Sequence, residues 1–122
     1  MRKFGEIVDE IVAVKELYSA YPFDHPNPAD FWELIRRLND AEVDLLQLKI
    51  KVRTAYSKQY FFLVRARREH KGSLPEKDKV FAKEDENVAY LKSLLDNIAD
   101  THKSLSNTRI TITVHFKWIV AR

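Results

Sequence analysis

The sequence predicts a mainly α-helical protein organised around a long antiparallel αα-hairpin of coiled-coil type. Three observations predict this class: only two of the 122 residues are Gly and four are Pro, 32% are charged, and apolar residues recur at alternating steps of three and four. The chain length suits one domain. We therefore expect a single helical domain over residues 1–122 that assembles into an oligomer.

Residues 29–71 form the central predicted helix. The stretch contains no Gly or Pro, follows Pro28 and ends before Gly72. This placement fits a helix, because Pro is tolerated in the first turn but not further along. Steps of three and four residues along it define a mostly apolar stripe, the pattern of a coiled-coil seam. The stripe falters at Gln59 and contains Leu38, Ala41, Leu45, Leu48, Val52, Ala55 or Tyr56, Leu63 and Ala66.

The second half of this predicted helix is strongly basic. From Lys49 to Lys71 there are eight basic residues and one acidic residue, a net +7 in a chain whose total is +3. At 100° per residue the cations form two bands beside the apolar stripe, and aromatic residues lie in both bands. The candidate nucleic-acid-binding residues are Lys49, Lys51, Arg53, Lys58, Tyr60, Phe61, Phe62, Arg65, Arg67, Arg68 and Lys71.

Cations and aromatic rings on both sides of a packing face suit single-stranded nucleic acid, because cations bind its phosphates and rings stack on its bases. Two alternatives stay open. The charged residues can form a solvated face without a partner, which is the common role of charge runs. The aromatic residues can be buried beside the seam instead of stacking on bases.

Residues 1–21 form a predicted N-terminal helix, amphipathic from residue 4 to residue 20. Ile7, Ile11, Val14 and Tyr18 share its apolar face. A Pro-rich connector follows at residues 22–28, where three prolines exclude a helix. We expect three aromatic residues to pack locally across this connector, namely Phe23, Phe31 and Trp32.

Residues 74–122 form a return helix and a C-terminal segment. The run Ser73-Leu74-Pro75-Glu76 is a capping box that predicts the helix start. The helix should return antiparallel along residues 29–71 after a short turn. Its seam has Glu84 and His102 as polar members and is otherwise apolar, with Val80 or Phe81, Val88, Leu91, Leu95, Ile98 and Leu105.

The C-terminal segment supports two interpretations. Apolar residues alternate with polar ones from Ile110 to Trp118, as in a strand. The heptad spacing also continues to Ile119, missing only at Arg109. We favour a helix, with a break near residues 104–108 left open. A lone strand is the alternative, and it would need a partner from another chain.

The sequence lacks the motifs of catalysis. It contains no nucleophile elbow, no Gly-rich phosphate loop, no H-E-x-x-H and no Cys, and its four histidines lie far apart, at His25, His70, His102 and His115. We expect no enzymatic activity, no metal and no cofactor. We expect the acidic run at residues 84–86 to be a solvated face. Without disulfides, a secretory leader or a membrane-spanning run, we expect a cytoplasmic protein that does not enter a membrane.

Three segments carry a family resemblance: the run from Leu48 to Tyr56, its end at Arg67 to Gly72, and the return from Val88 to Arg109. This layout resembles the UvsY-type recombination mediators of tailed phages, over roughly residues 40–115. The connector and the alternating C-terminal segment depart from that layout.

The resemblance implies a ring-forming homo-oligomer that binds single-stranded DNA. Such a protein helps to load a RecA-like recombinase while displacing the single-strand-binding protein, in the host cytoplasm if phage-encoded. By position, the resemblance assigns the DNA contacts to Lys49, Lys51 and Arg53, with Lys58, Arg65, Arg67 and Arg68 further along.

Our leading hypothesis is therefore a non-enzymatic, single-stranded-DNA-binding accessory protein of recombination. It would assemble through the apolar seams, and the sequence leaves open whether these pack within one chain or between chains. One alternative is a structural or adaptor helical protein, such as a virion component or assembly chaperone, whose basic bands contact an acidic protein. Another is a small helical subunit of an RNA-guided effector complex.

Overall fold

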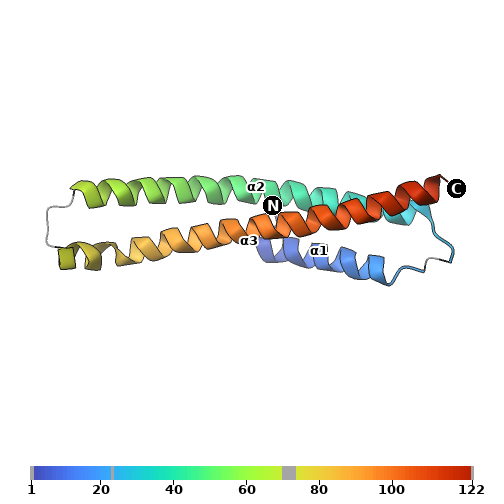
Figure 1. Ribbon diagram of the computed structural model, residues 1–122, viewed down its shortest axis with the longest axis horizontal. Helices are drawn as coiled ribbons and strands as arrows, with labels where there is room; N and C mark the ends of the chain where they lie inside the picture. Colours follow the sequence, from blue (N-terminus) through green and yellow to red (C-terminus); the bar gives the residue numbers. More distant parts are fainter. Residues whose placement is uncertain (1, 23, 70–73, 122) are drawn as a thin grey trace. The chain divides into compact units, whose positions relative to one another are not determined.

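The computed structural model consists of three helices: α1 at Phe4–Ser19, α2 at Pro28–Glu69 and α3 at Leu74–Val120 (Figure 1). It describes the backbone of residues 2–22, 24–69 and 74–121, and the side chains of residues 2–22, 24–68 and 85–121. No strand occurs in these ranges. The prediction of a mainly α protein is confirmed.

The C-terminal segment is helical, so the lone-strand alternative is wrong. Helix α3 runs to Val120, and no break occurs near residues 104–108. The alternating apolar residues divide between two faces of this helix. Ile112 is buried and Phe116 is half-buried, whereas Ile110, Val114 and Trp118 are exposed. Alternation over so few residues is compatible with a helix because positions four apart share a face.

Helix α2 begins one residue earlier than predicted and is continuous to Glu69. The Asn27 side-chain oxygen accepts a hydrogen bond from the Ala29 backbone N–H at 3.0 Å, which caps the first turn. The Tyr21 hydroxyl donates to Asp30 at 2.9 Å and accepts from the Asn27 N–H at 2.8 Å. These bonds hold the end of the connector against the helix start. The predicted helix end at residues 70–71 and the Ser73 cap lie outside the described residues.

The chain divides into two compact units, Met1–Leu48 with Ala99–Arg122 (unit 1) and Lys49–Ile98 (unit 2). Unit 1 contains α1, the first part of α2 and the last part of α3 (Figure 1). All three contribute buried apolar side chains to its core. The core contains Ile7, Ile11, Val14, Phe31, Leu34, Ile35, Leu38, Ala41, Leu45, Leu105, Ile112 and Ile119.

Aromatic packing in unit 1 centres on Phe31, which is fully buried. The centroid of its ring lies 4.7 Å from the ring centroid of Tyr21 and 5.1 Å from that of His115. The ring centroids of Trp32 and Phe116 lie 6.3 Å apart, yet 56% of Trp32 is exposed. Local packing is thus found for Phe31 and only in part for Trp32, while Phe23 lies outside the described residues.

A polar network explains why the α3 seam is interrupted at His102 and Arg109. Both Arg109 Nη atoms donate to the Glu42 carboxylate at 2.8 Å, and Arg109 also donates to the Asn39 side chain at 3.1 Å. His102 Nε2 lies 3.0 Å from the same carboxylate. The hydrogen bonds from Arg109, and secondarily that from His102, hold the pKa of Glu42 below its usual range. The two polar seam positions therefore join α3 to α2.

In unit 2 the buried residues Val52, Leu63 and Ile98 continue the same stripes. Tyr56 is half-buried whereas Ala55 is exposed, so Tyr56 takes the seam position that the sequence left open. In unit 1, Leu45 is fully buried by its own chain. The unit 1 part of the seam is therefore an intrachain core, and self-association through Leu45 would require the chain to open.

Candidate functional site

The candidate site is the basic segment, residues 49–68 of α2, which lies in unit 2. Ten of the eleven residues predicted to bind nucleic acid lie in it, and Lys71 lies outside the described residues. The segment is helical throughout because it contains no Gly or Pro and buries Val52 and Leu63 on one side. The remaining faces carry its charge.

Most cations of the basic segment point into solvent. Five of its basic side chains are exposed and Lys49 is half-buried. Within the described residues, no carboxylate lies within 4.0 Å of Lys49 or of four exposed cations, namely Lys51, Arg53, Lys58 and Arg68. These charges are not neutralised by the described part of the chain, so they are available to an external anion.

Three of the exposed cations form a row. Lys51, Lys58 and Arg65 follow one another at seven-residue steps, which is about 10.5 Å along the helix axis with little rotation around it. A linear polyanion lying along α2 can meet these cations in succession. The row is parallel to the buried stripe and does not compete with it for space.

Arg67 differs from the other cations. It is half-buried, and its Nη2 donates to the carboxylate of Asp85 on α3, within unit 2. Asp85 belongs to the acidic run that the sequence predicted to be a solvated face, and 45% of its side chain is exposed while it pairs with Arg67. We assign Arg67 to the contact between α2 and α3 within unit 2.

The three consecutive aromatic residues of the basic segment are all largely exposed. The exposed fractions are 51% for Tyr60, 69% for Phe61 and 59% for Phe62. The alternative that they are buried beside the seam is therefore wrong within this chain. The Tyr60 ring stacks on that of Tyr56, with 6.0 Å between centroids and 20° between planes. Exposed rings of this size among cations are typical of binding surfaces.

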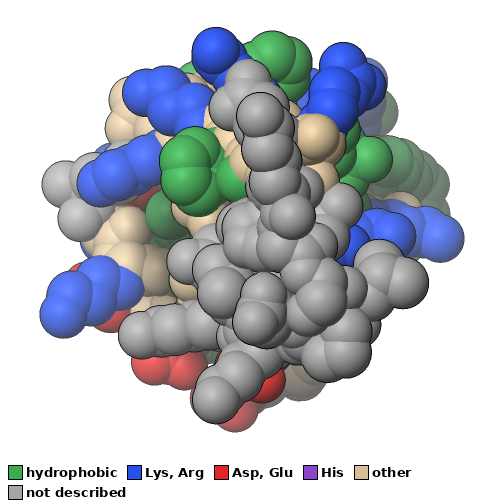
Figure 2. Space-filling model, turned by 90° about the vertical axis from the view of Figure 1, so that its left-hand side faces the viewer, with side chains coloured by type: hydrophobic (Ala, Val, Ile, Leu, Met, Phe, Trp, Pro, Cys, Tyr) green, Lys and Arg blue, Asp and Glu red, His purple; other side chains and the backbone are tan. Residues whose placement is uncertain are grey.

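A hollow of about 300 Å³ lies on the outward side of α2, lined by Phe61, Val64, Arg65 and Arg68. Figure 2, seen from the side on which α2 ends, shows Lys and Arg side chains at the upper left, left and right, with hydrophobic side chains between them. The Asp and Glu side chains that are visible lie mainly toward the bottom. The surface thus combines cations with apolar groups.

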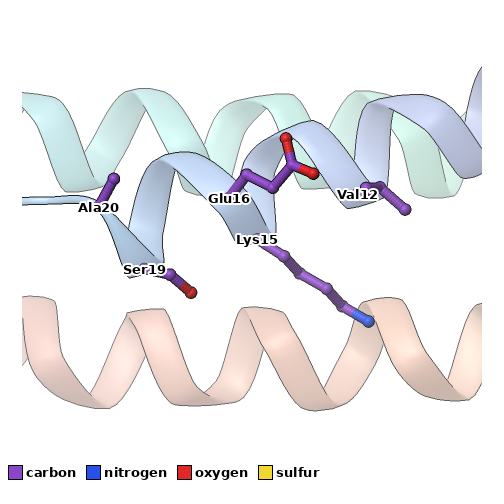
Figure 3. A pocket seen from close by; sticks show the side chains of 5 residues that line it. All are labelled: Val12, Lys15, Glu16, Ser19 and Ala20. Carbon is purple, nitrogen blue, oxygen red and sulfur yellow. The ribbon is translucent and has the colours of Figure 1, made fainter.

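Another hollow, of about 380 Å³, lies on α1 in unit 1 (Figure 3). Its lining consists of Val12, Lys15, Glu16, Ser19 and Ala20. Figure 3 shows Lys15 extending toward α3 and Glu16 pointing the other way, and Lys15 Nζ donates to Ser104 Oγ at 2.6 Å. Four of the lining residues come from α1 and Ala20 follows its end. Because these side chains do not converge on one point, the hollow lacks the arrangement of a reactive site.

Within the residues that the structure describes, no group of three or more His, Asp or Glu could hold a metal ion. No helix of the described part is long and apolar enough to cross a membrane.

Sequence reasoning missed three features of the polar surface. It missed the Glu42–Arg109 pair, although the absence of an apolar residue at position 109 of the seam was a usable signal. It missed the partner of Arg67, because that choice depends on which α3 residue lies opposite. It also missed Val64 as the apolar wall beside Phe61.

Comparisons with protein-family models, with curated proteins and with solved structures found no match for this chain. The resemblance to UvsY-type mediators therefore has no support beyond the residues that suggested it.

Proposed function

We propose that the protein is a non-enzymatic single-stranded-DNA-binding accessory protein of recombination, and that the basic segment of α2 is its binding surface. The observation that carries this proposal is the row of exposed cations beside exposed aromatic rings. Lys51 and Lys58 have no acidic partner in the described part of the chain, and Phe61, three residues after Lys58, is 69% exposed. Phosphates and bases are the ligands that such a surface fits.

The wider biological role in this proposal rests on the resemblance to UvsY-type mediators. In that role the protein assembles into a ring or another homo-oligomer in the cytoplasm, of the host if phage-encoded. It loads a RecA-like recombinase and displaces the single-strand-binding protein. Oligomerisation strengthens binding because several basic segments then engage one strand, and the second contact is intramolecular.

The proposal also includes the arrangement of α2 and α3 as an antiparallel hairpin. The contacts within each unit support it. In unit 1, Phe31 meets His115 whereas Glu42 meets Arg109, so residue numbers rise in α2 as they fall in α3. In unit 2, Arg67 meets Asp85. In such a hairpin the buried stripe faces α3, which leaves the cation row of α2 accessible.

Charge reversal tests the binding surface. We expect Lys51→Glu with Lys58→Glu to lower affinity for a labelled single-stranded oligonucleotide by at least about tenfold at low salt, because two phosphate contacts become repulsive. The matched control is Lys103→Glu with Lys117→Glu, which changes the net charge equally at two exposed positions of unit 1. Fluorescence anisotropy measures affinity, and circular dichroism verifies that both variants stay helical.

Equal losses in the two double variants would show that only net charge matters and would refute the assignment to the basic segment. Absence of binding by the unaltered protein at low salt would refute DNA binding altogether. An acidic protein partner would then account for the cations.

A further inference from the structure

We propose that the hollow beside Phe61 is a single-nucleotide subsite. One base of the strand stacks on the Phe61 ring, and the phosphates on either side of that nucleotide contact Arg65 and Arg68. This inference rests on the proposed single-strand binding and adds to it a defined place where a base, and not only the backbone, is bound.

The first support is the composition of the hollow. Its lining combines one aromatic ring, one aliphatic side chain and two guanidinium groups, from Phe61, Val64, Arg65 and Arg68. A nucleotide presents the matching chemistry, because its base is flat and apolar on its faces and its phosphates are anionic. At about 300 Å³, the hollow has the size at which small-ligand sites begin, ~300 Å³.

The second support is the spacing along α2. Val64, Arg65 and Arg68 follow Phe61 by three, four and seven residues, which places all four on one helical face. That face points away from Leu63, which is 95% buried on the opposite side (5% exposed). The subsite is therefore built on one rigid helix and needs no rearrangement of the core to receive a base.

The third support is the contrast with the neighbouring rings. Tyr60 already stacks on Tyr56, so one face of its ring is occupied. Phe62 is 59% exposed but does not belong to the lining of this hollow. It lies about 100° around the helix from Phe61 and hence away from Val64 and Arg68. Of the three rings, only Phe61 combines exposure with two adjacent guanidinium groups.

Stacking of this kind does not discriminate between bases, because every base has a flat π face. The subsite thus accepts any nucleotide of a single strand. It excludes a base that is paired and stacked within a duplex, because such a base has no free face. The inference therefore gives a physical reason for a preference for single strands without a sequence preference.

The test compares Phe61→Ala with the matched control Tyr90→Ala, on a labelled single-stranded oligothymidylate and on an abasic strand of equal length. Tyr90 is a 68% exposed ring on α3, outside the basic segment. We expect Phe61→Ala to weaken oligothymidylate binding about tenfold, since a stacked base contributes on this order. Binding of Phe61→Ala to the abasic strand should change less than about twofold, and so should binding of Tyr90→Ala to either strand. Circular dichroism verifies folding, which neither exposed ring should affect.

A second measurement uses Phe61→Trp and Tyr90→Trp. The indole keeps a stacking surface, so Phe61→Trp should bind oligothymidylate as well as the unaltered protein does. Its added fluorescence, taken as the difference from the unaltered protein, should be quenched by oligothymidylate and not by the abasic strand. The added fluorescence of Tyr90→Trp should respond to neither strand.

Equal losses for Phe61→Ala and Tyr90→Ala, or an equal loss of Phe61→Ala on both strands, would overturn the subsite while leaving single-strand binding intact. A lack of quenching in Phe61→Trp would also overturn it. If the unaltered protein binds neither strand at low salt, the subsite and the proposed function both fail.

Discussion

The arginines described in unit 1 have different surroundings from Arg53 and Arg68 of unit 2. In unit 1, Arg2, Arg36, Arg37 and Arg109 each contact a carboxylate, at distances from 2.5 to 2.8 Å. In the basic segment of unit 2, Arg53 and Arg68 contact no carboxylate in the described ranges. Over the whole sequence, unit 1 has nine basic and eleven acidic residues, whereas unit 2 has twelve and seven.

This difference separates two uses of the same side chain. A guanidinium held by a carboxylate fixes how two helices pack, as Arg37 does when its Nε donates to Glu10 of α1 at 2.5 Å. Cations without such partners repel one another slightly along a helix and so cost stability in the free protein. A bound polyanion removes that cost. The predictions below test whether unit 1 uses its charges for folding and the basic segment uses them for binding.

The largest effect should come from a charge placed in the core of unit 1. We expect Leu45→Asp to unfold unit 1, because the side chain is fully buried and an unpaired buried carboxylate costs several kcal/mol beyond the lost packing, together roughly 4 kcal/mol or more. Tryptophan fluorescence reports on this unit, since Trp32 and Trp118 both lie in it. The control is Val43→Asp, at a position 54% exposed. Equal stability of the two variants would contradict the assigned buried face.

A smaller effect should follow from removing the carboxylate that pairs with Arg109. Glu42→Gln loses the bidentate hydrogen bonds and leaves Arg109 without its charged partner. Because both side chains are partly exposed, we expect a loss of about 1–2 kcal/mol in the free energy of unfolding. Urea denaturation followed by tryptophan fluorescence measures it. The control is Glu33→Gln, which lies in an exposed pair with Arg36 and should not change stability measurably. If Glu42→Gln also left stability unchanged, the Glu42–Arg109 pair would not stabilise unit 1.

Acid should destabilise unit 1 through the same carboxylates. Hydrogen bonds from Arg109 to Glu42 and from Arg37 to Glu10 lower the pKa of each acid. Each pair therefore contributes stability above the unfolded pKa of about 4.3, and this contribution is lost as the pH falls through the lower folded pKa. Urea midpoints measured between pH 6 and pH 3, about the range where carboxylates titrate, should fall less steeply in Glu42→Gln. Parallel curves would show that these carboxylates do not hold unit 1 together.

The smallest effect concerns two adjacent arginines of unit 2. Arg67 pairs with Asp85 and Arg68 has no acidic partner in the described ranges. We expect Arg68→Gln to weaken single-strand binding severalfold and leave stability unchanged. Arg67→Gln should lower stability slightly, as for a surface ion pair, and change binding less. Fluorescence anisotropy measures the binding of both variants, and thermal melts measure their stability. A larger loss of binding in Arg67→Gln than in Arg68→Gln would show that a cation paired with a carboxylate still binds the strand.

The helices and the buried stripes could be predicted from the sequence because they depend on spacing within one segment. Leu38 and Leu45 were identified in this way. The ion pairs could not be predicted, since Arg67 meets Asp85 and Glu42 meets Arg109 across 18 and 67 residues. Which side chains meet depends on how two helices are aligned along each other, and this alignment does not follow from the spacing of residues within one segment.

The candidate site was predictable in its residue types and less so in its geometry. The cluster of cations is visible in the sequence, but periodicity alone did not tell Phe61 from Phe62, because both lie beside the seam. The pattern of the C-terminal segment is compatible with two structures. Alternation from Ile110 to Trp118 is typical of a strand, although the same residues divide between the buried and exposed faces of α3.

The salt dependence of single-strand binding tests the central claim most directly. If each protomer neutralises four to five phosphates through the basic segment, log K should fall with log salt at a slope of about −3 per protomer. The neutralising variant Lys51→Gln with Lys58→Gln should lower the magnitude of this slope by about 1.4. A slope near zero, or one that the variant leaves unchanged, would contradict the assignment of these cations to a nucleic-acid strand.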